Sequence, residues 1–266
     1  MTTDLPLVTC IMPTRNRSRF VARAIELFVA QDYPNKRLVV FENQRPETEH
    51  GVWGATFDHV NAARSKGVPI DCAYTHRQET IGQARNYACF YGHQRSCPIC
   101  YNGPEYGMLA WKKFYAHAGH TCERDGLIAH WDDDDWHSPY RLSMQVKAMR
   151  EQGARLCGLD RLVFYNGERA WLFQTPRKPW LAGGTLMYER SLWQEQPFLE
   201  VSDGEDTAFV DAAVSRGIKV ATLTDESLYV AMLHDANTTK RDVSRLGGSY
   251  DVDKVRRWIG DDNART

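Results

Sequence analysis

A chain of 266 residues, 42% hydrophobic and 25% charged, has the composition of an ordinary globular protein and is long enough for one α/β domain with an elaboration. Its formal net charge of −1 excludes a global electrostatic attraction to nucleic acid or to a membrane surface. No apolar run approaches the roughly 20 residues of a membrane helix, and the first residues lack the basic start and apolar core of a secretory signal. We therefore expect a cytoplasmic protein without a transmembrane segment.

The first 92 residues alternate between short apolar runs and amphipathic stretches. Residues 7–12 form an apolar run, residues 17–31 carry apolar side chains at helical spacing, and residues 37–41 form a second apolar run. Strand, helix and strand in this order predict a parallel βαβ unit. Further elements are expected as helices at 58–66 and 81–92 and a strand at 70–74.

Between about residues 93 and 125 the alternation is interrupted by a segment rich in Cys, His, Gly and aromatic residues. Afterwards it resumes, and a polar tail with a short helix at 252–259 closes the chain. The later elements are expected as strands at 126–131, 183–188, 220–223 and 228–232, helices at 139–152 and 206–216, and antiparallel strands within 156–173.

Four consecutive carboxylates, Asp132–Asp135, follow the strand expected at 126–131. Adjacent carboxylates repel each other and raise each other's pKa unless a cation lies between them. Carboxylate oxygens at the end of a strand suit a hard divalent ion that bridges to phosphates. The alternative is a solvated acidic turn that caps the next helix. Because the carboxyl ends of strands are where α/β sheets bind ligands, we favour a site for Mn²⁺ or Mg²⁺.

Around this cluster the sequence resembles the large inverting glycosyltransferase family 2, whose fold is called GT-A, over roughly residues 5–234. Residues 8–16 resemble the family's opening strand and its Pro-Thr-aromatic-Asn turn, with Arg15 in place of the aromatic residue. Glu42 stands where the family has an aspartate that reads the base, and residues 82–86 resemble a Gly-x-Ala-x-Asn segment near the nucleotide. The resemblance implies a donor site that includes Pro13, Thr14, Arg15, Glu42 and Arg85.

The acidic cluster, with Pro139 after it, resembles the family's Asp-x-Asp metal motif. The resemblance implies Asp134 as the metal ligand, with Asp132 and Asp133 near the ribose and the water shell of the metal. It also implies that Gly184 frames the donor sugar. His234 stands where many members place a late histidine on the metal, and a packed histidine is the alternative for this position.

Glu205 and Asp206 resemble the family's Glu-Asp pair, of which the aspartate is the catalytic base. Glu205 would orient the acceptor or tune Asp206. The alternative is an acidic pair that is favoured only by the dipole of the helix it begins. The resemblance implies the fold of a mostly parallel central sheet with helices on both faces, within a domain at 1–240 followed by a tail at 241–266. It also implies a nucleotide-sugar donor, with UDP as the first candidate.

The interrupting segment predicts a structural zinc site. Cys97 and Cys100 form a Cys-x2-Cys pair, and two further ligands would complete a tetrahedral Zn²⁺ site. The sequence offers His117, His120 and Cys122 downstream and Cys89 and His93 upstream, and His117 and Cys122 are the first candidates. Free thiols in a compact loop are the alternative. Basic and aromatic residues at 111–115 form either an amphipathic helix or an acceptor-binding surface. The acceptor is therefore expected to be a glycan or small molecule, with DNA or RNA as a second candidate.

Two other functions compete with glycosyl transfer. A nucleotidyltransferase also joins an α/β fold to paired carboxylates, but it normally has a Gly-rich basic phosphate loop, of which residues 15–17 are a faint version. A zinc-stabilised nucleic-acid-binding protein without catalysis predicts a strongly basic surface, against which the net charge of −1 argues.

Overall fold

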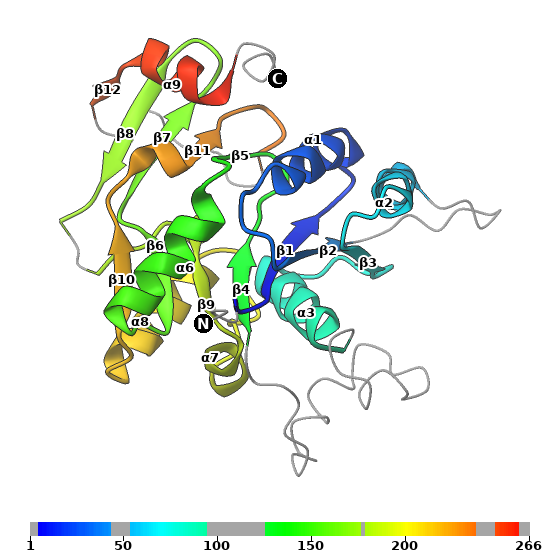
Figure 1. Cartoon of the computed structure of the whole chain (residues 1–266), viewed down its shortest axis with the longest axis horizontal. Coiled ribbons are helices and arrows are strands. Elements are labelled where there is room, and N and C mark those ends of the chain that lie inside the picture. The colour runs from blue at the N-terminus through cyan, green and yellow to red at the C-terminus, as the bar shows by residue number, and fades with distance from the viewer. Residues whose placement is uncertain (1–4, 44–53, 95–125, 177–178, 238–247, 261–266) are drawn as a thin grey trace.

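The computed structural model describes residues 5–43, 54–94, 126–176, 179–237 and 248–260, and its described strands form two sheets (Figure 1). The larger sheet has the order β10-β6-β9-β4-β1-β2-β3 and the smaller one the order β12-β8-β7-β11-β5. The strands of the larger sheet are β1 (Val8–Thr14), β2 (Lys36–Glu42), β3 (Ile70–Tyr74), β4 (Leu127–His130), β6 (Leu156–Leu159), β9 (Met187–Glu189) and β10 (Val220–Leu223). Those of the smaller sheet are β5 (Trp136–His137), β7 (Arg161–Tyr165), β8 (Ala170–Gln174), β11 (Tyr229–Met232) and β12 (Ser249–Tyr250).

The larger sheet is mostly parallel, as the sequence predicts. Strand β1 pairs in parallel with β2 and β4, β2 with β3, and β6 with β10, whereas β9 runs antiparallel to β4 and β6. The apolar runs of the sequence become strands because both faces of the sheet are covered, so that successive side chains are all buried. Cys10 and Met12 of β1 point into one core and Ile11 into the other.

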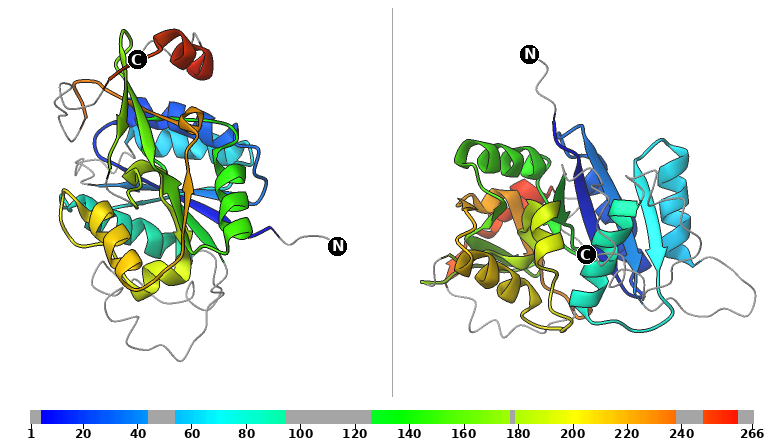
Figure 2. Two further views of the ribbon diagram at one scale, coloured as in Figure 1. Left: turned by 90° about the vertical axis from the view of Figure 1, so that its left-hand side faces the viewer. Right: turned by 90° about the horizontal axis from the view of Figure 1, so that it is seen from below.

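Helices cover both faces of this sheet (Figure 2). One face packs against α1, α2 and α6, and the other packs against α3, α7 and α8. The α-helices are α1 (Ser18–Val29), α2 (Ala55–Ser65), α3 (Ile81–Gln94), α6 (Arg141–Gln152), α7 (Arg190–Glu195), α8 (Glu205–Ser215) and α9 (Val252–Ile259), with 3-10 turns η2 (Gly183–Thr185) and η3 (Glu226–Leu228). No helix among the described residues is both long and apolar enough to cross a membrane.

The smaller sheet differs in part from the expectation for residues 156–173. Strands β7 and β8 do pair antiparallel, but β6 belongs to the larger sheet, where it runs parallel to β10. The strand expected at 183–188 is divided into η2 and the short strand β9. At the C-terminal end, β12 pairs with β8, and Val255 and Ile259 of α9 are buried in the core. The polar C-terminal region thus contributes a strand and a helix that pack on the domain.

The cysteines of the described residues have free thiols. Cys10, Cys89 and Cys157 are buried, and burial raises the pKa of each thiol to about 12, so they are packing residues and not reactive thiolates. The zinc ligands expected from the sequence, Cys97, Cys100, His117 and Cys122, lie outside the described residues.

Asn86 on α3 anchors the segment that leads toward α8. Its side-chain oxygen accepts hydrogen bonds from the indole nitrogen of Trp193 at 2.9 Å and the backbone nitrogen of Phe198 at 3.0 Å. Its amide nitrogen donates to the Phe198 carbonyl at 2.9 Å. Asn86 is 1% exposed, so all three bonds are made away from water. The resemblance implies that the segment containing Asn86 lies near the nucleotide. In this structure the Asn86 side chain is buried and connects α3 to the segment at Trp193 and Phe198.

We predict that Asn86→Ala lowers the free energy of unfolding by about 3 kcal/mol, because buried polar groups of Phe198 and Trp193 lose their partner. Urea denaturation followed by circular dichroism measures the change. Asn61→Ala, at an exposed position of α2, is the matched control and should change stability by less than about 0.5 kcal/mol. Equal effects of the two substitutions would contradict the assignment.

Candidate active site

A cavity of about 400 Å³ opens at the carboxyl ends of β1 and β4, where the two sheets meet. Its lining includes all four residues Asp132–Asp135, as expected for a ligand site at this edge of an α/β sheet. Among the described residues, the charged groups that line it are two arginines and seven carboxylates, namely Arg17, Arg85, Asp132, Asp133, Asp134, Asp135, Asp203, Glu205 and Asp206. The cavity is therefore strongly acidic.

Asp133 is held from the end of β1 and the turn that follows it. The Thr14 hydroxyl donates to its Oδ2 at 2.6 Å, and the Arg17 guanidinium donates to its Oδ1 at 2.6 Å. Burial raises the pKa of Asp133 to about 7, although the positive charge of Arg17 acts in the opposite direction. Thr14, which the resemblance assigns to the donor, here orients a carboxylate of the acidic cluster.

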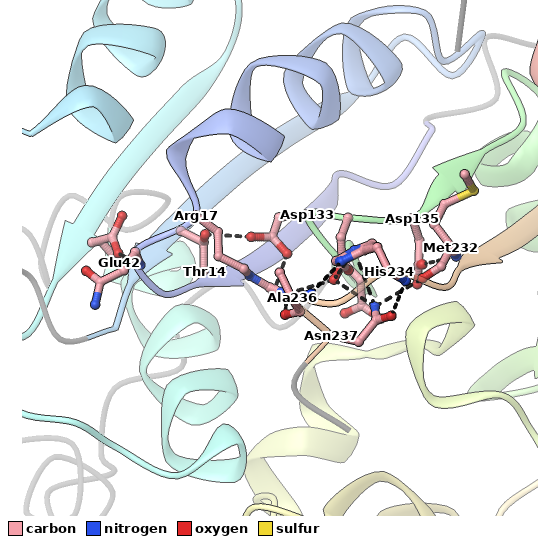
Figure 3. Close-up of polar contacts among 12 residues, drawn as sticks. Thr14, Arg17, Glu42, Asp133, Asp135, Met232, His234, Ala236 and Asn237 are labelled. Atoms are coloured by element: carbon pink, nitrogen blue, oxygen red, sulfur yellow. Dashed lines mark hydrogen bonds and ion pairs between the residues drawn. The ribbon is translucent and has the colours of Figure 1, made fainter. Parts of the chain in front are cut away.

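Asp134 collects donors from segments that are distant in sequence. Its Oδ2 accepts from Arg17 at 2.7 Å, lies 3.3 Å from His234 Nε2 and lies 3.4 Å from the Asn237 amide nitrogen. Burial acts to raise the pKa of Asp134, but the His234 hydrogen bond and the Arg17 charge outweigh it, and the pKa lies below its usual value. Figure 3 shows Arg17, Asp133, His234 and Asn237 gathered at this point.

Neighbouring residues hold both the ring and the backbone of His234 in place. Its ring stacks on Phe20 of α1 with 4.7 Å between the ring centres, and its Nδ1 accepts a hydrogen bond from the Ala236 backbone at 3.2 Å. Its backbone nitrogen donates to the Asn237 side chain at 2.7 Å. The fixed ring directs Nε2 toward Asp134, which is the pairing that the resemblance implies.

The geometry of Asp134 and His234 fits two neighbouring ligands of one divalent ion. Ligands at right angles on an octahedral ion with bonds of about 2.1 Å lie about 3 Å apart, and the two atoms here are 3.3 Å apart. No group of three or more His, Cys, Asp or Glu side chains within the described ranges is arranged to hold a metal. An ion at this position would therefore take its remaining ligands from water and from a bound phosphate, as Mg²⁺ usually does.

Tyr229 of β11 ties the other two aspartates to the smaller sheet. Its hydroxyl donates to Asp135 and lies 3.3 Å from Asp132 Oδ2, while the Met232 backbone nitrogen donates to Asp135 at 2.7 Å. Burial raises the pKa of Asp135 well above its usual value and also raises that of Asp132. Asp135 is thus a partly buried member of the cluster whose two oxygens are engaged by Tyr229 and by the Met232 backbone.

Glu205 and Asp206 begin α8 but face different partners. Glu205 is buried and forms an ion pair with Arg85, and burial raises its pKa despite that charge. Asp206 is only half-buried and lines the cavity; its Oδ1 accepts from the Thr207 backbone nitrogen at 2.6 Å. Its other oxygen, Oδ2, lies against the α-carbon of Gly183, where a β-carbon would overlap it. Asp206 is therefore the member of the pair with access to a ligand.

Gly183 and Gly184 allow several groups to approach each other closely. A β-carbon at Gly184 would overlap both the Tyr229 hydroxyl and the Asp132 carboxylate. The Gly183 carbonyl accepts from His130 Nδ1 at 2.7 Å. The double glycine in the sequence is thus explained by the close approach of Asp132, Asp206 and the Tyr229 hydroxyl to this turn.

Next to the acidic cluster lies a group of buried arginine and histidine side chains that no local sequence pattern predicted. Arg141 is fully buried and donates to the His130 carbonyl at 2.8 Å, and its guanidinium lies 2.5 Å from His137 Nδ1. The His137 ring stacks on Trp131 with 3.8 Å between centres. Burial, together with the charges of nearby arginines, holds the pKa of both histidines well below its usual value, so both rings are neutral.

Three residues assigned to the donor by resemblance do not line the cavity, namely Arg15, Glu42 and Thr14, the last of which is buried and hydrogen-bonded to Asp133. Arg15 is exposed, and Glu42 is buried with both carboxylate oxygens engaged. These oxygens accept from the Asn16 backbone at 3.0 Å and the Thr56 hydroxyl at 2.6 Å. Pro13, Arg85, Asp132, Asp133 and Gly184 do line the cavity.

Sequence reasoning missed Arg17, Tyr229 and Asn237 as members of the site. Arg17 had a weak signal, since it lies in the basic turn after β1, where Asn16 adopts a positive φ of 54°. Tyr229 and Asn237 had none, because their contacts to Asp132, Asp134 and Asp135 join segments far apart in the chain.

Part of the cavity wall, called the aromatic wall below, is apolar and aromatic. It is formed by the smaller sheet and by the segment that precedes η2. Its rings contact each other edge to face, with 6.5 Å between Phe164 and Phe173 and 5.1 Å between Phe173 and Trp180. Phe173 and Trp180 keep part of their surface accessible. The cavity thus offers both charged groups and a surface for stacking.

Comparison with solved structures identifies the fold. The chain resembles residues 1–349 of TarS from S. aureus in complex with UDP-GlcNAc, with a TM-score of 0.60 and 15% identity over 87% of this chain and 60% of that chain. It also resembles the mannosyltransferase PcManGT from Pyrobaculum calidifontis in complex with GDP-Man and Mn²⁺, with a TM-score of 0.57 and 15% identity over 87% of this chain and 57% of that chain. The fold is therefore the GT-A fold that the sequence resemblance implies.

The likeness is one of fold and not of close sequence. No protein-family model matches the sequence, and no protein of curated function matches it either. The chain spans about three fifths of the length of the TarS chain and of the mannosyltransferase chain. What it binds and transfers therefore has to be argued from its own cavity.

We predict that Gly184→Ala lowers the free energy of unfolding by about 1–3 kcal/mol, because the new methyl group pushes Tyr229 away from Asp132 and Asp135. Urea denaturation measures the loss. Gly248→Ala is the control, since a β-carbon there meets nothing within 4 Å. Unchanged stability of the Gly184 variant would show that the close approach at this turn is not needed.

A second prediction concerns pH. Because the pKa of His130 in the folded state is depressed, only the unfolded chain takes up this proton as pH falls below about 6.5, so stability is lost in that direction. One such proton contributes a slope of about 1.4 kcal/mol per pH unit. His130→Gln should reduce the measured slope of unfolding free energy between pH 6 and 5 by about one proton. His76→Gln, at an exposed ring, is the matched control, and equal slopes in the His130 variant and the wild type would refute the prediction.

Proposed function

We propose that this chain is a metal-dependent, inverting glycosyltransferase that moves a sugar from a nucleotide-sugar to an acceptor hydroxyl. One observation carries the proposal: in a GT-A fold, a single cavity is lined both by Asp134, whose Oδ2 lies 3.3 Å from His234 Nε2, and by the accessible Asp206 carboxylate. UDP is the first candidate for the nucleotide. The structures of similar fold that bind UDP-GlcNAc and GDP-Man support a nucleotide-sugar donor.

The donor side of the reaction requires stabilisation of a departing diphosphate. Mn²⁺ or Mg²⁺, held by Asp134 and His234, would supply a Lewis acid for the negative charge that develops there. Thr14 and Arg17 orient the neighbouring carboxylate Asp133, and Tyr229 and the Met232 backbone engage both oxygens of Asp135. This division leaves Asp134 as the aspartate directed to the ion.

The acceptor side requires a base for the attacking hydroxyl. Asp206 fits this role because it lines the cavity while the Thr207 backbone holds one of its oxygens. Glu205 is directed away into its ion pair with Arg85, so it positions the start of α8 and leaves Asp206 as the base. Direct attack from the face opposite the diphosphate inverts the anomeric centre.

The aromatic wall supports an acceptor with a flat, partly apolar face. Phe173 and Trp180 line the same cavity as Asp206, which packs against Gly183. Sugar rings and nucleobases both stack on such surfaces. A glycan or small molecule is the first candidate for the acceptor, because the described lining has seven carboxylates and only two arginines. DNA or RNA is the second candidate.

Nucleotidyl transfer is less well supported by the same cavity. Such an enzyme needs several cations for a triphosphate, but the described lining has two arginines against seven carboxylates. It also gives no role to an accessible Asp206. Product analysis separates the two reactions, since glycosyl transfer releases a nucleoside diphosphate and nucleotidyl transfer releases pyrophosphate.

We predict opposite behaviour of Asp206→Asn and Asp134→Asn. The first should lower turnover by about 100- to 10,000-fold, because asparagine cannot accept the proton, and should leave UDP affinity in the presence of Mn²⁺ nearly unchanged. The second should abolish most of the metal-dependent UDP affinity. Donor hydrolysis gives turnover where the acceptor is unidentified, and calorimetric titration of UDP, with GDP in parallel, gives affinity.

Asp203→Asn is the matched control, because Asp203 lines the same cavity but is exposed and is assigned no role in the reaction. It should keep both turnover and affinity. Equal loss of UDP binding in the Asp206 and Asp134 variants would contradict the separation of roles. Absence of UDP and GDP binding to the wild type with either ion would overturn the proposed function itself.

A further inference from the structure

The Arg17 guanidinium lies between the carboxylates of Asp133 and Asp134. Its two terminal nitrogens fork across two neighbouring carboxylates, at 2.6 Å from Asp133 Oδ1 and 2.7 Å from Asp134 Oδ2 (Figure 3). The Asp134 oxygen that it contacts is the same Oδ2 that lies 3.3 Å from His234 Nε2. A divalent ion held between Asp134 and His234 would therefore bind an oxygen that Arg17 already holds.

We propose that Arg17 is a displaceable counter-cation of this site. When no divalent ion is bound, its guanidinium neutralises Asp133 and Asp134; when the ion and a nucleoside diphosphate bind, it leaves Asp134 and contacts the diphosphate. This inference rests on the proposed function for its second half only. Competition between arginine and ion for Asp134 follows from the contacts alone.

Electrostatics require such a cation. Four carboxylates adjacent in sequence converge in a largely buried loop, where each charge is costly unless a partner lies beside it. A guanidinium is always charged and matches two carboxylate groups through its planar fork. The same guanidinium cannot stay 2.7 Å from Asp134 Oδ2 while a divalent ion binds there, because the two cations would repel each other at close range.

The attachment of Arg17 allows it to move without disturbing the fold. The residue lies at the start of α1, so its backbone is fixed, whereas its side chain is 19% exposed and lines the cavity. Its Nη1 also lies 3.4 Å from the Ala236 carbonyl, next to the segment that carries His234. Guanidinium groups bind phosphate oxygens in the same two-point manner as carboxylates. A diphosphate on the ion would thus offer Arg17 an equivalent partner.

The test uses the whole chain and measures binding instead of turnover. Free Mn²⁺ is titrated without nucleotide and detected by electron paramagnetic resonance, for the wild type, Arg17→Met, Arg17→Lys and Arg19→Met. Methionine keeps the apolar stem without the charge, and lysine keeps the charge without the fork. Arg19 is an exposed arginine on the same helix and lies over the Phe20 ring, outside the cavity lining.

We expect Arg17→Met to tighten Mn²⁺ binding by about tenfold or more, because a charged hydrogen-bonded competitor is removed. Arg17→Lys should show a smaller gain, and Arg19→Met none. With Mn²⁺ at saturation, Arg17→Met should bind UDP about tenfold more weakly than the wild type. The opposite signs of the two changes are the signature of a group that passes from carboxylate to phosphate.

Mn²⁺ affinity that is unchanged or weaker in Arg17→Met, in protein whose thermal unfolding matches the wild type, would overturn the competition. If Arg17→Met is unstable, the same comparison between Arg17→Lys and the wild type decides. If Mn²⁺ binding tightens but UDP affinity is unaffected, the second half of the inference is overturned. Failure of the wild type to bind UDP or GDP with any ion would refute the proposed function, and the Mn²⁺ titration would still test the competition by itself.

Discussion

The neutralisation of four adjacent carboxylates is the constraint on which this structure depends. Asp132–Asp135 leave the end of β4 into a region with little access to water, where unpaired charges would be prohibitively costly. The hydrogen-bond donors that stabilise these carboxylates come from several parts of the chain, and Arg17 and Tyr229 each contact two of them. Donors come from the turn after β1, from β11 and from the segment that follows it. The acidic loop therefore draws these segments together at one edge of the sheet.

This convergence also joins the two sheets. β5, which follows the acidic loop directly, pairs with β11, and Tyr229 of β11 returns to bind the loop. Beneath it, Arg141 and His137 support the backbone of the loop from α6 and β5. The smaller sheet then brings its aromatic face toward the acidic edge of the larger one, and the space left between them is the cavity. Polar pairing and apolar packing thus shape the same site.

The site separates its carboxylates by environment. Asp133 and Glu205 are buried and paired with Arg17 and Arg85. Asp135 is partly buried and bonded to Tyr229, whereas the partly buried Asp206 makes no ion pair among the described residues and lines the cavity. Asp134 is the carboxylate of the loop whose pKa lies below its usual value, because two cationic or hydrogen-bonding partners converge on it. Side chains of one chemical type are in this way suited to different tasks: structure, ion binding and proton transfer.

Local patterns were sufficient for the order of elements and for part of the site. The apolar run before Pro13, the helical spacing after Arg17 and the runs that become β3 and β10 are properties of neighbouring residues, and the structure agrees with them within a few residues. The acidic cluster at a strand end is also visible locally, because a strand and the residues after it are contiguous. The GT-A fold followed from the order of these motifs.

Tertiary structure alone decided which side chains meet. The sequence does not show that Glu42 is engaged by Asn16 and Thr56, or that Arg17, instead of Arg15, faces the cavity, because both depend on how the turn after β1 is oriented. The sequence does not show the contact of Tyr229 with Asp135 either. Each residue belongs to a separate stretch of the chain, and the two stretches meet only when the two sheets pack together. Interactions between distant segments depend on packing, and packing leaves no periodic signal in the sequence.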